Sequence, residues 1–215
     1  MKKYHLLALI IIMIAEITCL PVSGDENINS SSGAYFLRAG YSFPTEDINS
    51  GGFAFSLGRS CRLIDSLYIE AEGMLSLPES DFVINESVNS IGSGELKLAS
   101  ININMNYYFI SSDSFKIYLK AGTGYCINTI SPKDIYEELG FTIEESLDDS
   151  IHFNFGFGSD FSIFDNIALN LDIRYTLNSV TGTWYVKDEI SGAEIFGNTD
   201  DSLNFITVLL GIKFN

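Results

Sequence analysis

Residues 34–43 read AYFLRAGYSF, and their side chains alternate between two kinds, one residue at a time. Every second residue is apolar: Tyr35, Leu37, Ala39, Tyr41 and Phe43. The residues between them are mostly small or polar: Phe36, Arg38, Gly40 and Ser42. Successive side chains of a strand point to opposite faces. This stretch therefore predicts a strand with one apolar face and one small or polar face.

The same alternation recurs about eight times before the chain ends. It predicts strands over the approximate ranges 34–43, 52–62, 66–76, 96–109, 115–127, 150–162, 167–176 and 203–214. Short segments such as 111–114 and 164–166 join some of these strands. The other connections are longer, at 44–51, 77–95, 128–149 and 177–202. Short turns that alternate with long loops are typical of membrane barrels.

The composition of the polar face separates a membrane barrel from a soluble, lipocalin-like barrel, since both kinds alternate. Here that face is rich in Gly, Asn, Ser and Ala, which suit a crowded, narrow lumen. Aromatic residues also lie toward the ends of the apolar faces, where interfacial girdles belong: Tyr41, Phe43, Tyr107, Phe109, Tyr175 and Phe214. We predict an all-β protein, an eight-stranded antiparallel transmembrane barrel, with the soluble barrel as the alternative.

The first 24 residues have the three-part layout of a secretory signal peptide. A basic start precedes an unbroken apolar run at 6–14, and small residues precede Asp25. A membrane-spanning helix is the alternative, but a span needs about 20 apolar residues, and Glu16 interrupts this run. Cys19 raises a lipoprotein alternative, although the residues before it match that processing pattern poorly.

These patterns divide the chain into three parts. We predict a cleaved signal peptide at 1–24, a flexible polar segment at 25–33 and the barrel at 34–215. The leader has a net charge of +1 from Lys2, Lys3 and Glu16. Since the full chain has a net charge of −16, the part without the leader has a net charge near −17. Such an acidic chain argues against nucleic acid as a partner, because phosphate binding needs a basic surface.

Several short segments carry a resemblance to a known family: KAGTGY at 120–125, FGFGSDF at 155–161, LNLDIRY at 169–175 and the closing GIKF at 211–214. The chain resembles the small eight-stranded outer-membrane barrels of the OmpA/OmpX type, often called porin-family proteins. The resemblance implies location in the cell outer membrane and a C-terminal signal, with Gly211 and Phe214, for the barrel-assembly machinery. Asn215 departs from the family, which usually ends on the aromatic residue itself.

Strand parity places eight charged residues on the lumen face: Arg38, Glu70, Glu72, Lys120, Asp160, Asp172, Arg174 and Lys213. Four bases balance four acids, and unpaired charges in a poorly hydrated lumen are costly. We therefore expect a network of ion pairs across the barrel, in which Arg38 pairs with Glu70 or Glu72. Since eight strands leave an interior just wide enough for side chains to fill, we expect a plugged lumen.

Other candidate sites have simpler explanations. His152 lies near Asp148, Asp149 and Ser150, an arrangement that a lipid-modifying enzyme would need, but parity turns His152 into the lumen. The Gly-x-Gly pairs at 122–124 and 156–158 do not extend to a phosphate-binding pattern and make room for larger side chains. The acidic loop at 133–149 lacks a calcium-loop pattern, which leaves a solvated surface or a divalent-ion bridge to lipopolysaccharide.

The sequence therefore predicts a barrel with no catalytic, cofactor-binding or metal-binding residues. We expect a structural or surface-interaction role for a plugged barrel with acidic extracellular loops. The alternatives are a narrow channel for small solutes and a lipid-modifying enzyme. The expected partners are outer-membrane lipids, lipopolysaccharide, the assembly machinery and an extracellular ligand of unknown identity. We expect the protein to be a monomer.

Overall fold

The computed structural model describes residues 33–45, 49–81, 93–132 and 140–214 of the 215-residue chain. The strands in these ranges are β1 (Ala34–Pro44), β2 (Asn49–Ile64), β3 (Leu67–Asp81), β4 (Ser93–Ser111), β5 (Phe115–Pro132), β6 (Phe141–Leu147), β7 (Ser150–Phe164), β8 (Ile167–Asp188), β9 (Glu194–Ser202) and β10 (Phe205–Phe214). No helix in the described part of the chain is long and apolar enough to span a membrane. The expected signal peptide and nearly all of the expected flexible segment lie outside the described residues.

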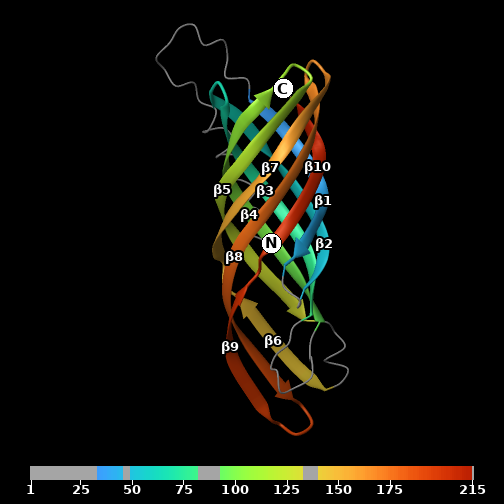
Figure 1. Cartoon of the computed structure of the whole chain (residues 1–215). Helices are drawn as coiled ribbons and strands as arrows, with labels where there is room; N and C mark the ends of the chain where they lie inside the picture. The colour runs from blue at the N-terminus through green and yellow to red at the C-terminus, as the bar shows by residue number, and fades with distance from the viewer. Residues whose placement is uncertain (1–32, 46–48, 82–92, 133–139, 215) are drawn as a thin grey trace.

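Eight of the strands close into an antiparallel ring, which confirms the predicted barrel (Figure 1). Their order is β10-β1-β2-β3-β4-β5-β7-β8, and β8 pairs back with β10. The closing strand β10 thus has a partner on each side, since Tyr35 of β1 and Ile167 of β8 both align with its Phe214. A closed ring leaves none of these strands with a free edge along the barrel.

Beyond one end of the ring, β8 continues as the middle strand of a second, smaller sheet (Figure 1). β6 pairs with β8 from Leu147↔Gly182 to Phe141↔Asp188, and β9 pairs with its other edge from Ser179↔Ser202 to Lys187↔Glu194. We call this three-stranded sheet the extension. The prediction of loops at 128–149 and 177–202 is wrong in this respect, because much of both ranges is strand.

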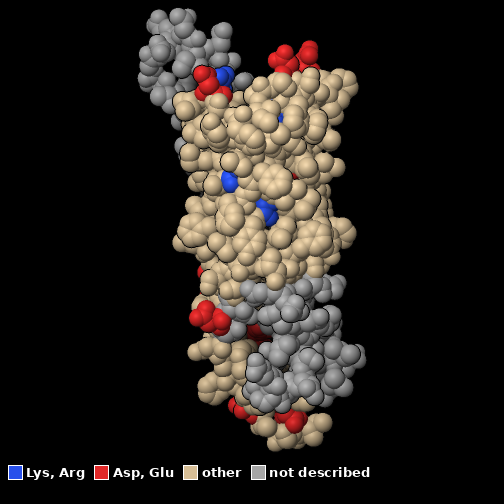
Figure 2. Space-filling view, viewed as in Figure 1, with Lys and Arg blue, Asp and Glu red and all other residues tan. Residues whose placement is uncertain are grey.

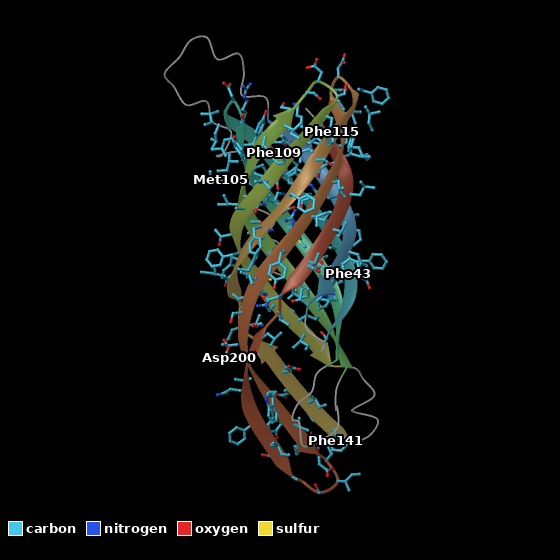
Figure 3. All side chains as sticks on the ribbon, viewed as in Figure 1. Phe43, Met105, Phe109, Phe115, Phe141 and Asp200 are labelled. Carbon is cyan, nitrogen blue, oxygen red and sulfur yellow. The ribbon has the colours of Figure 1, made fainter. Side chains whose placement is uncertain are left out.

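The barrel wall has an apolar outer face and a mostly polar inner face. In β1 the exposed residues Tyr35, Leu37 and Phe43 alternate with the buried Phe36, Arg38 and Ser42. Figure 3 shows Phe43 and Met105 pointing away from the barrel, and on the face seen in Figure 2 the barrel wall carries only a few charged residues. A soluble protein rarely exposes so large an apolar surface. The polar and charged side chains of the wall lie mostly on the face that surrounds the lumen, and this face carries the candidate site.

Candidate functional site: a charge network in the lumen

The structure places the eight predicted charged side chains inside the barrel. Arg38 comes from β1, the two glutamates from β3, Lys120 from β5, Asp160 from β7, Asp172 and Arg174 from β8, and Lys213 from β10. Each of these residues is at most 6% exposed. Their common inward direction follows from strand parity, since residues two apart in a strand share a face.

Arg38 lies at the centre of the network. Its Nη2 is 2.9 Å from Glu70 Oε2, and its Nη1 is 3.1 Å from Glu72 Oε1. The sequence predicts a pair with either glutamate, and Arg38 contacts both at once. Its guanidinium also lies 3.7 Å from the centre of the Phe36 ring, so a cation–π contact adds to the ion pairs.

Two further cations complete the central group. Lys120 Nζ lies 2.6 Å from Glu70 Oε1 and 2.5 Å from Asp172 Oδ2. Arg174 binds Glu72 through both terminal nitrogens, and its Nε donates to Asp172 Oδ1 at 2.7 Å. Three cations thus meet three carboxylates, and each carboxylate touches at least two cations. Such a group has no net charge to draw an ion into the lumen.

A second group of charges lies nearer the short turns. Lys213 Nζ is 3.0 Å from Asp160 Oδ2, and the Tyr108 hydroxyl donates to the same carboxylate oxygen at 2.8 Å. Asn170 joins the two groups, because its Nδ2 donates to Asp160 Oδ1 while its Oδ1 accepts from Arg38 Nε. The ion pairs therefore form one connected network that spans several layers of the lumen.

Neutral side chains satisfy the remaining oxygens of the network, and none of them belongs to the set of charged residues predicted from the sequence. Asn102, Asn104 and Asn106 of β4 donate to the two glutamates, and the Tyr118 hydroxyl donates to Asp172. These residues have the same parity as the charged ones, and the run ININ at 101–104 shows it plainly. The signal was present, but a search limited to charged residues passes over it.

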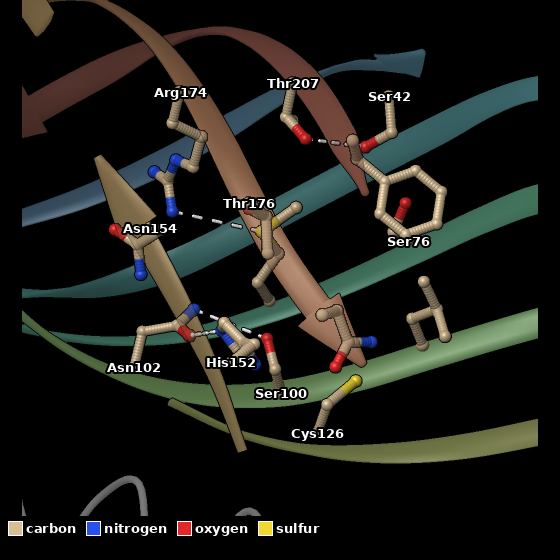
Figure 4. Close-up of a pocket in the computed structure, with 14 residues that line it drawn as sticks. Ser42, Ser76, Ser100, Asn102, Cys126, His152, Asn154, Arg174, Thr176 and Thr207 are labelled. Atoms are coloured by element: carbon tan, nitrogen blue, oxygen red, sulfur yellow. Dashed lines mark hydrogen bonds between the residues drawn. The ribbon is translucent and has the colours of Figure 1, made fainter. Parts of the chain in front are cut away.

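A polar chamber lies between the central group and the extension (Figure 4). His152 and Asn102 line it beside Arg174, with 2.7 Å between His152 Nε2 and Asn102 Oδ1. Its free volume is about 30 Å³, room for about two water molecules at roughly 10–15 Å³ each. Leu98 and Phe205 line it on the side away from the charges. The chamber is too small for a larger solute.

Apolar side chains fill the lumen beyond the chamber. They are buried, and they come from β4, β5, β6, β8, β10 and the segment between β9 and β10. We call them the apolar cap: Leu96, Leu98, Cys126, Ile130, Leu147, Val180, Leu203 and Phe205. The lumen thus passes from ion pairs, through a polar chamber, to an apolar section that the strand alternation does not predict.

The residues of the suggested enzyme-like cluster have separate partners. Ser150 Oγ donates to Asn178 Oδ1, Thr181 donates to Asp148, and the Tyr125 hydroxyl donates to Asp149. His152 contacts Asn102, a neutral amide. Among the described residues no three His, Cys, Asp or Glu side chains come together in a way that would hold a metal ion. In this part of the chain the geometry assembles neither a nucleophile with its base nor a metal centre.

The two residues of the expected assembly signal lie at the end of β10. Phe214 is 45% exposed on the outer face of the wall. Gly211 aligns with Arg38 on one side and Asn170 on the other. A Cβ atom at Gly211 would lie 2.1 Å from the backbone oxygen of Leu37, so the strands approach too closely there for a side chain.

Comparison with known proteins identifies the family. Residues 18–214 match the family described as "Outer membrane protein beta-barrel domain". The chain belongs to this family. As an outer-membrane barrel protein it resides in the cell outer membrane, with its apolar wall in contact with lipid. A comparison with curated proteins found no match.

Solved structures of outer-membrane proteins share the barrel fold. OprG from Pseudomonas aeruginosa is 12% identical, with a TM-score of 0.63, and the match covers 86% of this chain and 96% of OprG. A major outer membrane protein from Thermus thermophilus is 12% identical, with a TM-score of 0.59 over 85% of this chain and 98% of that protein. Neisserial surface protein A is 14% identical, with a TM-score of 0.56 over 85% of this chain and 96% of that protein. At these identities the likeness concerns the fold alone.

Proposed function

We propose that this outer-membrane barrel is a closed, non-enzymatic protein whose lumen is plugged by ion pairs and whose acidic extension meets partners outside the cell. The central charge network is the observation that carries the proposal. Membrane barrels have short periplasmic turns and longer extracellular segments. The extension lies opposite the short turns Asp65–Ser66 and Asp165–Asn166, so we assign it to the extracellular side.

An ion that enters the lumen has to separate charges that neutralise one another. Glu70 faces Arg38 and Lys120, while Asp172 faces Lys120 and Arg174. Removal of one partner from a buried ion pair costs about 3–5 kcal/mol, and several such contacts lie together in the central group. This energetic cost supports a barrel that passes few ions.

The apolar cap supports the same conclusion from the extracellular side. Apolar constrictions exclude water and thereby stop ions. Val180 and Leu96 of the cap are each 1% exposed, so solvent does not reach them. An ion would therefore meet an unfavourable apolar section before it reached the polar chamber and the network below.

Planar bilayers test the plug directly. We expect the purified wild type to show no steady single-channel conductance, and Arg38→Ala to raise the leak because Glu70 and Glu72 lose their shared cation. Arg62→Ala is the matched control, since Arg62 forms an exposed pair with Asp65 at the short-turn end. A steady, large conductance in the wild type would contradict the proposal and favour the narrow channel for small solutes.

Analysis of lipid A tests the non-enzymatic part of the proposal. We expect identical lipid A mass spectra from cells with and without the protein, because His152 bonds to an amide rather than to a carboxylate. A change in acyl chains that disappears in His152→Asn would overturn this part and establish a lipid-modifying enzyme.

A further inference from the structure

The outer face of the extension continues the lipid-facing face of the barrel. In β8 the odd-numbered residues Leu169 and Leu177 are exposed on the apolar wall. The same parity carries Thr183 and Tyr185 onto the outer face of the extension. With the extracellular orientation proposed above, on which this inference rests, this face rises from the lipid into the layer directly above it, where the sugars of the outer-leaflet glycolipid lie.

Two rows of side chains stand next to each other on this face. One row aligns Glu144 of β6, Tyr185 of β8 and Phe196 of β9, and the other aligns Ser146, Thr183 and Asn198. A hollow of about 390 Å³ is lined by these six residues and by Glu145, Trp184 and Gly197. The last three form the row between the other two, and strand parity points their side chains to the opposite face of the sheet.

The chemistry of the two rows matches a sugar ring. A pyranose has a face of C–H groups that stacks on aromatic rings and a rim of hydroxyl groups that needs donors and acceptors. Tyr185 and Phe196 provide aromatic surface, and Thr183, Ser146 and Asn198 provide hydroxyl and amide groups. Phe196 is 83% exposed, so a partner that covers it removes apolar surface from water.

We propose that this hollow binds a neutral sugar of the lipopolysaccharide that surrounds the barrel. Continuity with the lipid-facing wall points to the membrane's own glycolipid rather than to a soluble glycan. Charge selects the kind of sugar, because Glu144 and Glu194 border the aromatic row and Lys187, which pairs with Glu189, is the nearest cation on the described part of this face. Carboxylates repel phosphate groups over the Debye length of about 8 Å at physiological salt.

Binding of a released oligosaccharide tests this site without any assumption about conductance. The probe is lipopolysaccharide oligosaccharide freed by mild acid and dephosphorylated, titrated into the full chain in detergent. Saturation-transfer NMR detects bound sugar protons. Trp184, the single tryptophan of the chain, reports by fluorescence because it is one of the residues that line the hollow. We expect saturable binding by the wild type.

Variants on the two faces of β9 locate the site. Phe196→Ala should weaken binding about three- to tenfold, the range of an aromatic contact worth roughly 0.6–1.4 kcal/mol. Ile195→Ala is the matched control, since Ile195 is 58% exposed on the opposite face of the same strand. Asn198→Ala supplies a second loss-of-binding variant should Phe196→Ala fold poorly, with the gel mobility of unboiled samples as the measure of folding.

Several results would overturn the proposal. One is the absence of saturable binding by the wild type at millimolar sugar, and another is an equal loss of affinity in Phe196→Ala and Ile195→Ala. Binding that requires both the phosphates and a divalent cation would replace the neutral sugar with a cation-bridged phosphate. Binding of an unrelated soluble glycan alone would show that the hollow faces an outside partner instead.

Discussion

Arg38 shows how much a single residue contributes to the lumen. It is 1% exposed and contacts Glu70 and Glu72 directly, and through Asn170 it is linked to Asp160. Strand parity alone predicts that these residues face inward, because the alternation in residues 34–43 and 66–76 is regular. Parity says nothing of how the strands are offset, so the contacts of Lys120 with Asp172 and of Arg174 with Glu72 could not be predicted.

Replacement of Arg38 should destabilise the barrel. Arg38→Ala leaves two buried carboxylates short of a partner, and we expect the free energy of unfolding to fall by about 3–5 kcal/mol. Urea unfolding of the folded protein in lipid micelles measures this change. Arg62→Ala, at an exposed pair, should cost less than about 1 kcal/mol. Equal effects of the two substitutions would show that the central network does not stabilise the barrel.

Strand β8 contains one part that the sequence pattern predicts and one part that it does not predict. The predicted strand at 167–176 covers the part whose odd residues face lipid, from Ile167 to Tyr175. Beyond it, the run NSVTGT at 178–183 loses the contrast between apolar and polar faces, because water rather than lipid meets its outer side. The same loss of contrast concealed β6 and β9. Hydrophobic alternation predicts strands where one face meets lipid, and fails where both meet polar surroundings.

The extension should respond to pH through one carboxyl group. Burial raises the pKa of Glu145 from 4.5 to about 7. Between these values the folded state binds a proton that the unfolded state has lost, so the stability of the extension falls as pH rises through this window. Trp184 aligns with Glu145, and its fluorescence should titrate with a midpoint near 7. Glu145→Gln should abolish this transition, whereas a wild-type midpoint near 4.5 would contradict the prediction.

The last strand should matter for assembly. Phe214 faces outward at the end of β10, where the expected signal for the assembly machinery lies. Phe214→Ala should lower the amount of folded barrel in cells, measured from the unboiled band in outer-membrane fractions. Ile212→Ala, on the same outer face of the same strand, should have a smaller effect. Wild-type amounts of folded Phe214→Ala protein would remove Phe214 from the signal.

Two features of the whole molecule can be tested together: the closure of the strands into a ring and the extracellular orientation of the extension. The ring should resist detergent, so unboiled and boiled samples should migrate differently on a denaturing gel. Trypsin added to intact cells should cleave after Lys187, which lies near the tip of the extension next to the turn at 189–193. The fragments should stay together until the sample is boiled. Lys187→Gln should prevent this cut.

Protection of Lys187 in intact cells, with cleavage only after the outer membrane is opened, would reverse the assigned orientation. Identical mobility of boiled and unboiled samples would argue against a detergent-resistant ring. The two measurements are independent, because the first depends on which side the extension occupies and the second on the pairing of β10 with β1 and β8.

The connectivity of the lumen network also governs the order of events during folding. Arg38 and Asn170 are 132 residues apart, and Arg174 and Glu72 are 102 residues apart. Contacts between such distant parts of the chain form late, because the chain between them has to be ordered first. Until the ring closes, six central charges lack their full set of partners and retain their hydration. The lumen of the incomplete barrel therefore stays hydrated, and water leaves it when β10 pairs with its neighbours.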